Sequence, residues 1–210
     1  ENIAVPNSYF EEIKSWSEEN DLLKKKSFFS SKSNNELVNW LRSQKTDVIL
    51  ISRGDPLWFG IGRILLENFS KDELSFYPSN TCIQLAFSKL KIPWQDTVNV
   101  SIHGRDSTKL IEALKARPSN LAVITDSNNK SLEIIKKNLS EFDLIDIYDF
   151  WLCEEIGFEN EKIRKLNLKE SLPSDISNLN IAILSKKKEN YSNNNLPLFG
   201  INDNLFKTFD

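Results

Sequence analysis

Three of the chain's six glycines fall within nine residues, in the sequence Gly-Asp-Pro-Leu-Trp-Phe-Gly-Ile-Gly from Gly54 to Gly62. An apolar run at residues 47–51 precedes them and is short enough for a buried parallel strand. Residues 63–69 follow with apolar side chains at helical spacing. This order predicts a strand, a glycine-bearing turn and a helix. In an open α/β sheet, ligands bind at the turn that follows a strand's carboxyl end. Glycine there lets a ligand approach the backbone, although an ordinary tight turn is the alternative.

Length and composition define the broad class of protein. The 210 residues are 40% hydrophobic and 27% charged, which is typical of a soluble globular protein with one sizeable core or two small ones. The net charge of −3 argues against a general nucleic-acid binder. No apolar run approaches the roughly 20 residues that span a bilayer, so we expect no membrane association. Cys82 and Cys153 show no C-x-x-C spacing, and we therefore expect no metal site and a cytoplasmic location.

Strand and helix patterns alternate along the chain in two series. Helices are predicted at residues 8–19, 63–69, 81–90, 107–115 and 130–139. A further helix is predicted to start after a cap at Asn34 or Asn35. Strands are predicted at residues 47–51, 74–78, 97–102, 121–125, 144–152 and 180–185. Because the alternation breaks after Pro78, we predict an α/β fold with lobes at 1–78 and 79–188. Residues 189–210 fit a linker or tail, and the lack of Met at position 1 indicates that the first lobe is N-terminally incomplete.

Polar residues also follow two strands of the second series. His103-Gly104-Arg105 comes after the strand at 97–102, where His suits acid/base chemistry or anion contact. The alternative is a solvated turn. Thr125 and Asp126 close the next strand and offer a hydroxyl and a carboxylate to a ligand, or cap the helix that begins near residue 131.

One more residue and two residue pairs have both a functional and an ordinary interpretation. Asp55 could accept hydrogen bonds from a ligand or cap the following helix. Trp58 and Phe59 could form the wall of a site for a flat ligand, but aromatic residues beside a helix start are more often core. Glu154 and Glu155 resemble a carboxylate pair, yet adjacent residues on a strand point to opposite faces. We therefore do not expect a catalytic dyad at that position.

The stretch from Ile51 to Arg105 resembles the tetrapyrrole methylases, and within them the precorrin-6Y C5,15-methyltransferases (decarboxylating) of cobalamin biosynthesis. The similar segments are G-D-P-L-W-F-G-I-G at 54–62, Q-L-A-F at 84–87, I-P-W-Q-D at 92–96, S-I-H-G-R at 101–105, I-T-D at 124–126 and C-E-E-I-G at 153–157. The G-D-P turn marks the broad superfamily, whereas W-Q-D followed by H-G-R is the more specific part. The segment Pro197 to Asp203 resembles the join to a second methyltransferase domain in fused forms.

The resemblance implies a two-lobed fold, each lobe an α/β sandwich with a mainly parallel or mixed sheet, and S-adenosylmethionine as the cofactor in the cleft between the lobes. Carried over by position, the cofactor contacts would be Arg53, Gly54, Asp55, Trp58, Thr81, Cys82, Thr125, Asp126 and Gly157. This sequence departs from the family pattern in three places. The glycine-proline loop after the family's first strand is absent, Arg53 stands where a small residue is usual, and Ser79-Asn80 replaces a glycine-containing pair.

The implied reaction is C-methylation of a corrin precursor of the precorrin-6 type. Methyl transfer from a sulfonium requires positioning and desolvation rather than a nucleophilic side chain, and we assign no catalytic residue. Because corrin precursors carry many carboxylates, the candidates for substrate binding are Arg63, His103, Arg105 and Lys109.

Two alternatives remain open. One is a domain that binds the cofactor or a partner without turnover within a fused enzyme. The other is a methylase of the same fold that acts on a siroheme precursor or on diphthine. The partners we expect are a small tetrapyrrole substrate, a fused or associated second methyltransferase or decarboxylase domain, and further copies of the chain in a homo-oligomer.

Overall fold

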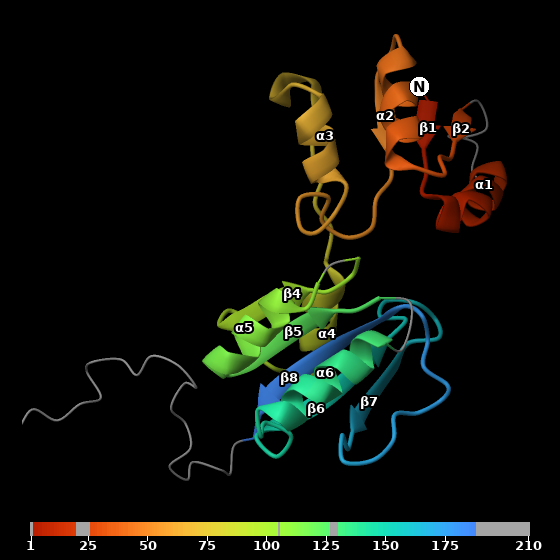
Figure 1. Cartoon of the computed structure of the whole chain (residues 1–210). Helices are drawn as coiled ribbons and strands as arrows, with labels where there is room; N and C mark the ends of the chain where they lie inside the picture. Colours follow the sequence, from red (N-terminus) through yellow and green to blue (C-terminus); the bar gives the residue numbers. More distant parts are fainter. Residues whose placement is uncertain (1, 20–25, 105, 127–129, 188–210) are drawn as a thin grey trace, which may run out of the picture. The chain divides into compact units, whose positions relative to one another are not determined.

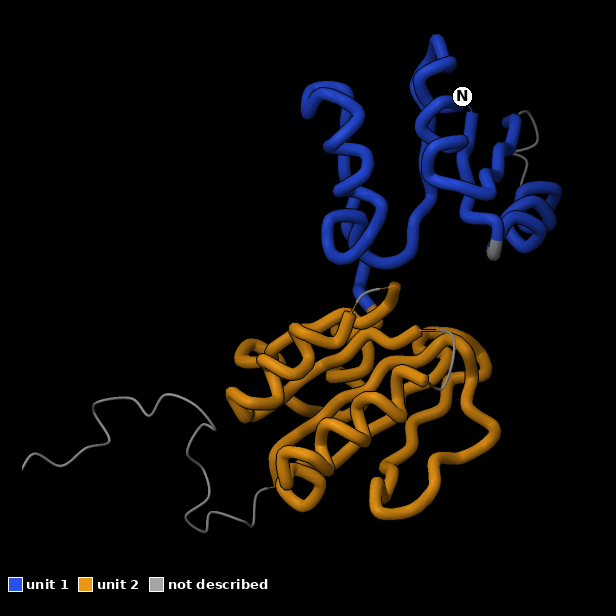
Figure 2. Tube along the Cα trace, viewed as in Figure 1, with its two compact units in different colours: residues 1–81 blue, residues 82–210 orange. Residues whose placement is uncertain are grey.

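The computed structural model describes residues 2–19, 26–104, 106–126 and 130–187, which belong to two compact units, 1–81 and 82–210 (Figure 2). The boundary predicted from the sequence lay after residue 78. In the ranges just given, every helix is too short or too polar to cross a membrane. Both units are α/β, as predicted, and each is described by itself below.

The first unit is built on a three-stranded parallel sheet in the order β2-β1-β3 (Figure 1). Its elements are β1 Asn2–Ala4, η1 Asn7–Tyr9, α1 Phe10–Glu19, β2 Ser27–Phe29, α2 Asn34–Ser43, β3 Val48–Leu50, α3 Gly62–Asn68 and η2 Lys71–Glu73. The central strand is apolar, and Ile3, Ala4 and Val5 are all at most 3% exposed. The chain leaves β1 toward β2 on one side and later returns to β3 on the other side. The carboxyl ends of β1 and β3 therefore flank a topological switch point, where open α/β sheets bind ligands.

Three sequence predictions for this unit need correction. Strands β1 and β2 were not predicted, because three-residue strands show no measurable periodicity. The strand predicted at residues 74–78 does not form, and its Tyr77 is 84% exposed, so the segment has no buried face. The cap of α2 is Ser33 rather than Asn34 or Asn35, since the Ser33 hydroxyl accepts the Glu36 N–H at 3.2 Å.

The second unit contains a five-stranded mixed sheet in the order β4-β5-β8-β6-β7. Its elements are α4 Cys82–Leu90, β4 Thr97–Ser101, α5 Thr108–Ala116, β5 Asn120–Ile124, α6 Lys130–Glu141, β6 Tyr148–Glu154, β7 Lys162–Leu166 and β8 Asn180–Lys186. Strands β4 and β5 are parallel, while β8 pairs antiparallel with both β5 and β6. The carboxyl ends of β4, β5 and β6 and the amino end of β8 consequently lie along one edge of the sheet.

Helices cover both faces of this sheet (Figure 1). Side chains alternate between the faces along each strand, and Leu121 and Val123 pack with Leu110 of α5 and Ile135 of α6 in one fully buried core. Cys153, which points to the opposite face, is 1% exposed. Figure 1 shows α4, which begins at Cys82, behind the sheet. Two apolar layers therefore fix the strand ends that carry the predicted site residues.

In the second unit, one predicted strand was wrong in extent and one strand was missed. Strand β6 begins at Tyr148 rather than residue 144, because Leu144 ends the turn after α6 by donating its N–H to the Leu139 carbonyl at 2.8 Å. Asp143, between them, has φ +55°, the left-handed conformation that commonly ends helices. Strand β7 was not predicted, since its Lys-Ile-Arg-Lys-Leu sequence belongs to a polar edge strand.

Candidate functional site

The left-handed backbone positions of the described chain fall into two groups. Lys91, Arg117 and Asp143 directly follow α4, α5 and α6, where such a conformation is an ordinary helix ending. The others lie in loops that follow the carboxyl ends of β3, β4 and β6, namely Gly54, Phe59, Gly104, Glu155 and Gly157. A strained backbone at strand ends is an arrangement that ligand sites use. Three of the segments predicted from the sequence, those after β3, β4 and β6, therefore share one structural feature.

Gly54 forms the first bend after β3, with φ +57°. A Cβ at this position would lie 3.4 Å from both the Asn80 carbonyl oxygen and the Thr81 Cα. The turn thus packs closely against residues 80–81 of the same unit, which brings two segments of the predicted cofactor site together. A Cβ would still fit at ordinary van der Waals distance, so it is the φ of +57° that favours glycine at position 54.

The rest of the loop is held by its own backbone. The Asp55 carboxylate accepts the Leu57 N–H at 2.8 Å, and the Gly62 N–H donates to the Pro56 carbonyl at 2.8 Å. A Cβ at Gly60 would lie 2.7 Å from that same carbonyl oxygen. Asp55 therefore braces the loop instead of capping α3, whose N-cap is Ile61 with no side-chain hydrogen bond.

Aromatic side chains surround this loop. Trp58 and Phe59 make an edge-to-face pair with ring centroids 4.8 Å apart. Phe59 combines φ +51° with 44% exposure, which is unusual for a bulky residue. The Arg53 guanidinium lies 4.5 Å from the centre of the Tyr9 ring, in the helix that follows β1. The two strand ends at the switch point are thereby joined by a cation–π contact.

Thr81 and Cys82, the two predicted cofactor contacts at the start of α4, differ in their burial. Thr81 is 9% exposed and lies beside Gly54. Burial raises the pKa of the half-buried Cys82 thiol, so this side chain is a neutral group near pH 7. Cys82 is accordingly suited to an apolar contact rather than to acting as a thiolate nucleophile.

In the second unit, the ends of β4 and β5 are joined through Asp126. Its Oδ1 accepts the Gly104 N–H at 2.8 Å and lies 3.1 Å from His103 Nδ1. His103 Nδ1 is also 3.2 Å from the Thr125 carbonyl oxygen. The Asp126 N–H donates to the Ser131 hydroxyl at 3.0 Å, at the start of α6. Four residues that the sequence placed near a ligand are thus in direct contact with one another.

The hydrogen bonds continue along the sheet edge toward β6. The Thr125 hydroxyl is 2.6 Å from both the main-chain and the side-chain oxygen of Asn180, the first residue of β8. Asn180 Nδ2 donates to the Ser177 carbonyl at 2.7 Å, and the Ser177 N–H donates to Glu154 at 2.9 Å. Because side-chain polar groups at this edge are engaged with one another, the predicted cofactor contacts of Thr125 would be made by its main chain.

Glu154 anchors the end of this network. Its carboxylate is 1% exposed and accepts two hydrogen bonds from Arg164, from Nε at 2.8 Å and Nη2 at 2.9 Å. Arg164 also donates to Asp175 at 2.8 Å. The neighbouring Glu155 instead accepts a hydrogen bond from the Ser177 hydroxyl. The two adjacent carboxylates therefore have different side-chain partners, Arg164 for Glu154 and Ser177 for Glu155.

The remaining predicted residues lie apart from these contacts or outside the described residues. Gly157, with φ +86°, follows β6, and its N–H donates to Glu161 at 3.0 Å. Arg63 is exposed in the first turn of α3 and lies 3.7 Å from Glu67. Lys109 is exposed in the first turn of α5. Arg105 lies outside the described residues.

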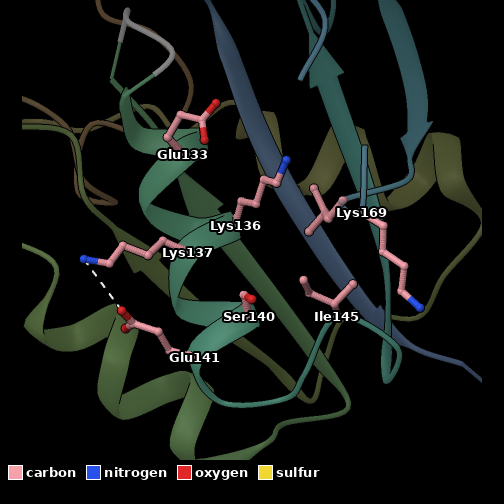
Figure 3. A pocket seen from close by; sticks show the side chains of 8 residues that line it. Glu133, Lys136, Lys137, Ser140, Glu141, Ile145 and Lys169 are labelled. Atoms are coloured by element: carbon pink, nitrogen blue, oxygen red, sulfur yellow. Dashed lines mark ion pairs between the residues drawn. The ribbon is translucent and has the colours of Figure 1, made fainter. Parts of the chain in front are cut away.

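A hollow on the outer surface of α6 is unrelated to the strand ends (Figure 3). It is lined by Glu133, Lys136, Lys137, Ser140, Glu141, Ile145, Leu168 and Lys169. Ile145 precedes β6 and Leu168 follows β7, so the hollow lies at the end of the sheet opposite Glu154. The exposed Lys137–Glu141 pair at 3.6 Å marks it as a solvated surface. We do not assign it to the site.

Sequence reasoning missed several residues that build the strand-end network. Tyr9 was treated as part of an ordinary helix, and Asn180 as the start of an ordinary strand. Ser131 was considered as part of a helix start, and Arg164 not at all. Asn180 and Arg164 carry no local signal, because they act through contacts with residues far away in the chain. For Tyr9, the sequence offered one indication, the Asn-Ser-Tyr segment before α1. Asn and Ser favour turns, so this segment indicated that Tyr9 lies near the end of a strand or the start of a helix.

The sequence matches the family model described as tetrapyrrole (corrin/porphyrin) methylases over residues 7–171. A probable cobalt-precorrin-7 C(5)-methyltransferase of Methanocaldococcus jannaschii is 26% identical over 157 residues, which are 73% of this chain and 72% of that protein.

Two solved structures share the fold. A cobalamin biosynthesis precorrin-6Y methylase from Archaeoglobus fulgidus has a TM-score of 0.61 at 21% identity. The superposition covers 89% of this chain and 85% of that chain. A uroporphyrin-III C-methyltransferase from Thermus thermophilus, complexed with S-adenyl homocysteine, has a TM-score of 0.60 at 18% identity, covering 88% and 84%. The two-unit α/β architecture with its parallel and mixed sheets agrees with these neighbours. The family match spans most of the chain, and this protein belongs to the tetrapyrrole (corrin/porphyrin) methylase family.

Proposed function

We propose that this chain is a methyltransferase that moves a methyl group from S-adenosylmethionine to a carbon of a precorrin-type tetrapyrrole in cobalamin biosynthesis. The observation that carries the proposal is the family match over residues 7–171, together with a cobalt-precorrin-7 C(5)-methyltransferase of which 72% is matched. Methyl transfer to carbon needs two reactants held in line and shielded from water. It does not need a nucleophilic side chain.

The residues present fit S-adenosylmethionine, which supplies a methyl group on a positively charged sulfur. In the first unit, Gly54 and Thr81 form a close backbone approach, and Asp55 and Trp58 lie in the same loop. A carboxylate suits the amine or hydroxyls of the ligand, and an aromatic ring suits adenine. In the second unit, the residues that the resemblance assigns to the cofactor lie at the start of α4 and after β5 and β6, and they are Cys82, Thr125, Asp126 and Gly157.

The substrate would be oriented by cations and by hydrogen-bond donors. Arg63 pairs with Glu67 at 3.7 Å, with both side chains more than half exposed, and such a pair contributes little. Its guanidinium can therefore exchange that partner for a carboxylate of the substrate. Lys109, His103 and Arg105 complete the proposed set. Arg105→Ala should raise the substrate KM more than His103→Ala does, because Arg can hold a carboxylate through two hydrogen bonds.

A second candidate function is binding without turnover, and one feature favours it. The loop after β1 contains Val5 and Pro6 in place of a glycine-proline loop, and Val5 is 3% exposed. Arg53 and Tyr9 occupy the adjacent switch point. A loop filled by side chains leaves less backbone accessible to a ligand than a glycine loop does.

Two measurements on the full chain test these functions. Calorimetric titration with S-adenosylmethionine should show binding, and incubation with methyl-labelled cofactor should label a precorrin substrate. Binding without labelling of any precorrin would support the second candidate function. Labelling of a siroheme precursor or of diphthine, with none of a precorrin, would overturn the proposed substrate. Absence of both binding and labelling would overturn the methyltransferase assignment itself.

The cofactor site has its own test in Gly54→Val. A β-branched side chain strongly disfavours φ +57°, and its γ-carbons would extend beyond a Cβ that already touches Asn80 and Thr81 at 3.4 Å, so cofactor affinity should fall at least tenfold, about 1.4 kcal/mol. Gly104→Val serves as the control for folding, since φ is +60° and no atom lies within 4 Å of the added Cβ, so its loss of stability measures the cost of the backbone conformation alone. If Gly54→Val folds and binds as tightly as the parent, the site does not include this turn.

Two proposals about partners rest on the sequence. The resemblance of Pro197 to Asp203 to a domain join supports a fused or associated second methyltransferase or decarboxylase domain. We also propose a homo-oligomer. Sedimentation of the full chain at several concentrations would test the second proposal, and a single monomeric species would overturn it.

A further inference from the structure

The environment of His103 fixes which of its ring nitrogens carries a hydrogen. Nδ1 faces two oxygens, the Thr125 carbonyl at 3.2 Å and Asp126 Oδ1 at 3.1 Å. A carbonyl oxygen accepts hydrogen bonds and never donates them, and an ionised carboxylate does the same. Both contacts can be favourable only when Nδ1 carries the hydrogen. The neutral ring then has its lone pair on Nε2.

Asp126 is itself held in place on several sides. Its Oδ1 accepts the Gly104 N–H at 2.8 Å, and its own N–H donates to the Ser131 hydroxyl at 3.0 Å. Its side chain is 32% exposed, whereas that of His103 is 66% exposed. The ring is therefore oriented from one side by a fixed carboxylate and is open to solvent on the other. No hydrogen bond joins Nε2 to any residue that the structure describes.

We propose that His103 Nε2 is the proton acceptor of the methylation reaction and that Asp126 is its positioning residue. The inference rests on the proposed function, which it deepens. The Thr125 carbonyl accepts the hydrogen bond from Nδ1–H, and the Asp126 carboxylate lies 3.1 Å from the same nitrogen, which leaves Nε2 as the basic atom of the neutral ring. Among the described residues, Asp126 is the charged group that faces the ring, while Ser131 of α6 contacts Asp126 instead of the ring.

The proton balance of C-methylation provides the task for such a base. The substrate carbon uses a pair of ring π electrons to form the new C–CH₃ bond, and the S–CH₃ bond breaks with its electron pair left on sulfur. The methylated carbon still carries its original hydrogen. When that C–H bond breaks, its electrons return to the conjugated ring and the proton goes to His103 Nε2. The sum is substitution of one hydrogen by methyl, with one proton released to water.

The test compares His103→Asn and Asp126→Asn with the unchanged chain. Asn at position 103 can still donate toward Thr125 and Asp126 but cannot accept a proton at the position of Nε2. We expect kcat to fall roughly 100-fold in His103→Asn, the low end of what general base catalysis contributes. Asp126→Asn should lower kcat in the same direction by a smaller factor. Cofactor affinity from calorimetry should stay within about twofold in His103→Asn.

The pH profile separates a proton acceptor from a merely structural residue. A proton acceptor makes kcat lower in acid than at neutral pH, and this difference should be present in the unchanged chain and absent in His103→Asn. Free imidazole should restore turnover to His103→Ala. Asp106→Asn is the matched control, because Asp106 belongs to the same loop but accepts the Thr108 N–H at 3.0 Å, and its profile should match the parent.

The outcomes distinguish this inference from the function on which it rests. If the unchanged chain methylates no precorrin, the proposed function fails first. If it does so and His103→Asn keeps the parental kcat and the parental difference between acid and neutral pH, the inference is overturned. A rise in KM with unchanged kcat in His103→Asn would likewise overturn it and assign His103 to substrate binding alone. Should His103→Asn fail to fold, an unchanged pH profile in Asp126→Asn would overturn the role of Asp126.

Discussion

The two units stabilise the carboxyl ends of their strands by different means. In the first unit, the loop after β3 is shaped by glycines, by its own backbone and by exposed aromatic residues. In the second unit, side chains at the ends of β4, β5 and β6 are joined through one chain of hydrogen bonds from His103 to Arg164. Unit 1 also contains most of the exposed large apolar side chains of the described chain, which are Trp16, Ile49, Leu57, Phe59, Leu66 and Tyr77.

Because of this difference, the two units should respond differently to substitution. A loop shaped by backbone sterics tolerates few substitutions, and its contacts with the rest of the chain stay within unit 1. In a network of side-chain hydrogen bonds, removal of one member also destabilises its neighbours. Each buried polar group that loses its partner lowers the stability of the fold. Substitutions in unit 1 should therefore have local effects, whereas those in unit 2 should spread from strand to strand.

The largest effect should come from Glu154→Ala. It leaves the Arg164 guanidinium, 19% exposed, without its buried partner, and breaking such a pair typically costs about 3–5 kcal/mol. Urea unfolding should show this loss, and hydrogen exchange should show it spreading to β7 and β8. Glu141→Ala is the matched control, since its exposed pair with Lys137 contributes at most about 0.5 kcal/mol. A loss below about 1 kcal/mol in Glu154→Ala would contradict the network.

Gly60→Ala should have the next largest effect, and it should be confined to unit 1. The added Cβ would lie 2.7 Å from the Pro56 carbonyl oxygen, and overpacking of this kind costs about 1–3 kcal/mol. In Gly104→Ala no atom lies within 4 Å, so only φ +60° opposes the side chain, at about 1 kcal/mol. Urea unfolding of both variants measures the two costs. An equal or smaller cost for Gly60→Ala would show that the loop adjusts freely.

Cys153 makes unit 2 sensitive to alkali. Burial raises the pKa of its thiol from 9.0 to about 12. A raised pKa stabilises the folded state fully below 9.0, and this stabilisation is lost as pH rises toward 12 because the unfolded chain ionises first. The loss should reach roughly 1–2 kcal/mol by about pH 10.5. Comparing urea unfolding of the parent and Cys153→Ala across this range should show a flatter dependence in the variant. Parallel curves would mean that the thiol ionises without unfolding.

The smallest effect should come from Arg53→Ala. Loss of the contact with Tyr9 at 4.5 Å should reduce stability by about 0.5–1 kcal/mol. Cofactor affinity should stay within about twofold, since the Arg53 side chain faces Tyr9 and only its main chain lies in the proposed site. Calorimetry measures the affinity, with Arg63→Ala as the control. A tenfold loss of affinity would place the guanidinium on the cofactor.

Much of the second unit could be predicted from the sequence, because its apolar periodicity is strong. The predicted helix at 130–139 corresponds to α6, and the predicted strand at 180–185 to β8. Short strands such as β1 escaped prediction, since three residues cannot show a period. The edge strand β7 escaped for another reason, because its lysines point to solvent and its Arg164 pairs with a residue ten positions earlier.

The candidate site was predictable in part. Glycine and polar residues after strands identified Gly54, His103 and Asp126, since ends of adjacent parallel strands must meet. The contact of Arg53 with Tyr9 depends on the order of strands in the sheet, which no local pattern encodes. The same holds for Asn180, which reaches Thr125 only because β8 inserts beside β5.

The central position of β8 has a consequence for how the protein comes to be folded. Strand β8 is the last strand of the described chain, yet it lies between β5 and β6. During synthesis on the ribosome, both of those strands must wait with unpaired edges until residues 180–186 have emerged. Pairings between such distant segments form slowly, and open edges recruit other chains. Substitutions that weaken β8 should therefore lower the yield of native protein more than they lower the stability of the finished fold.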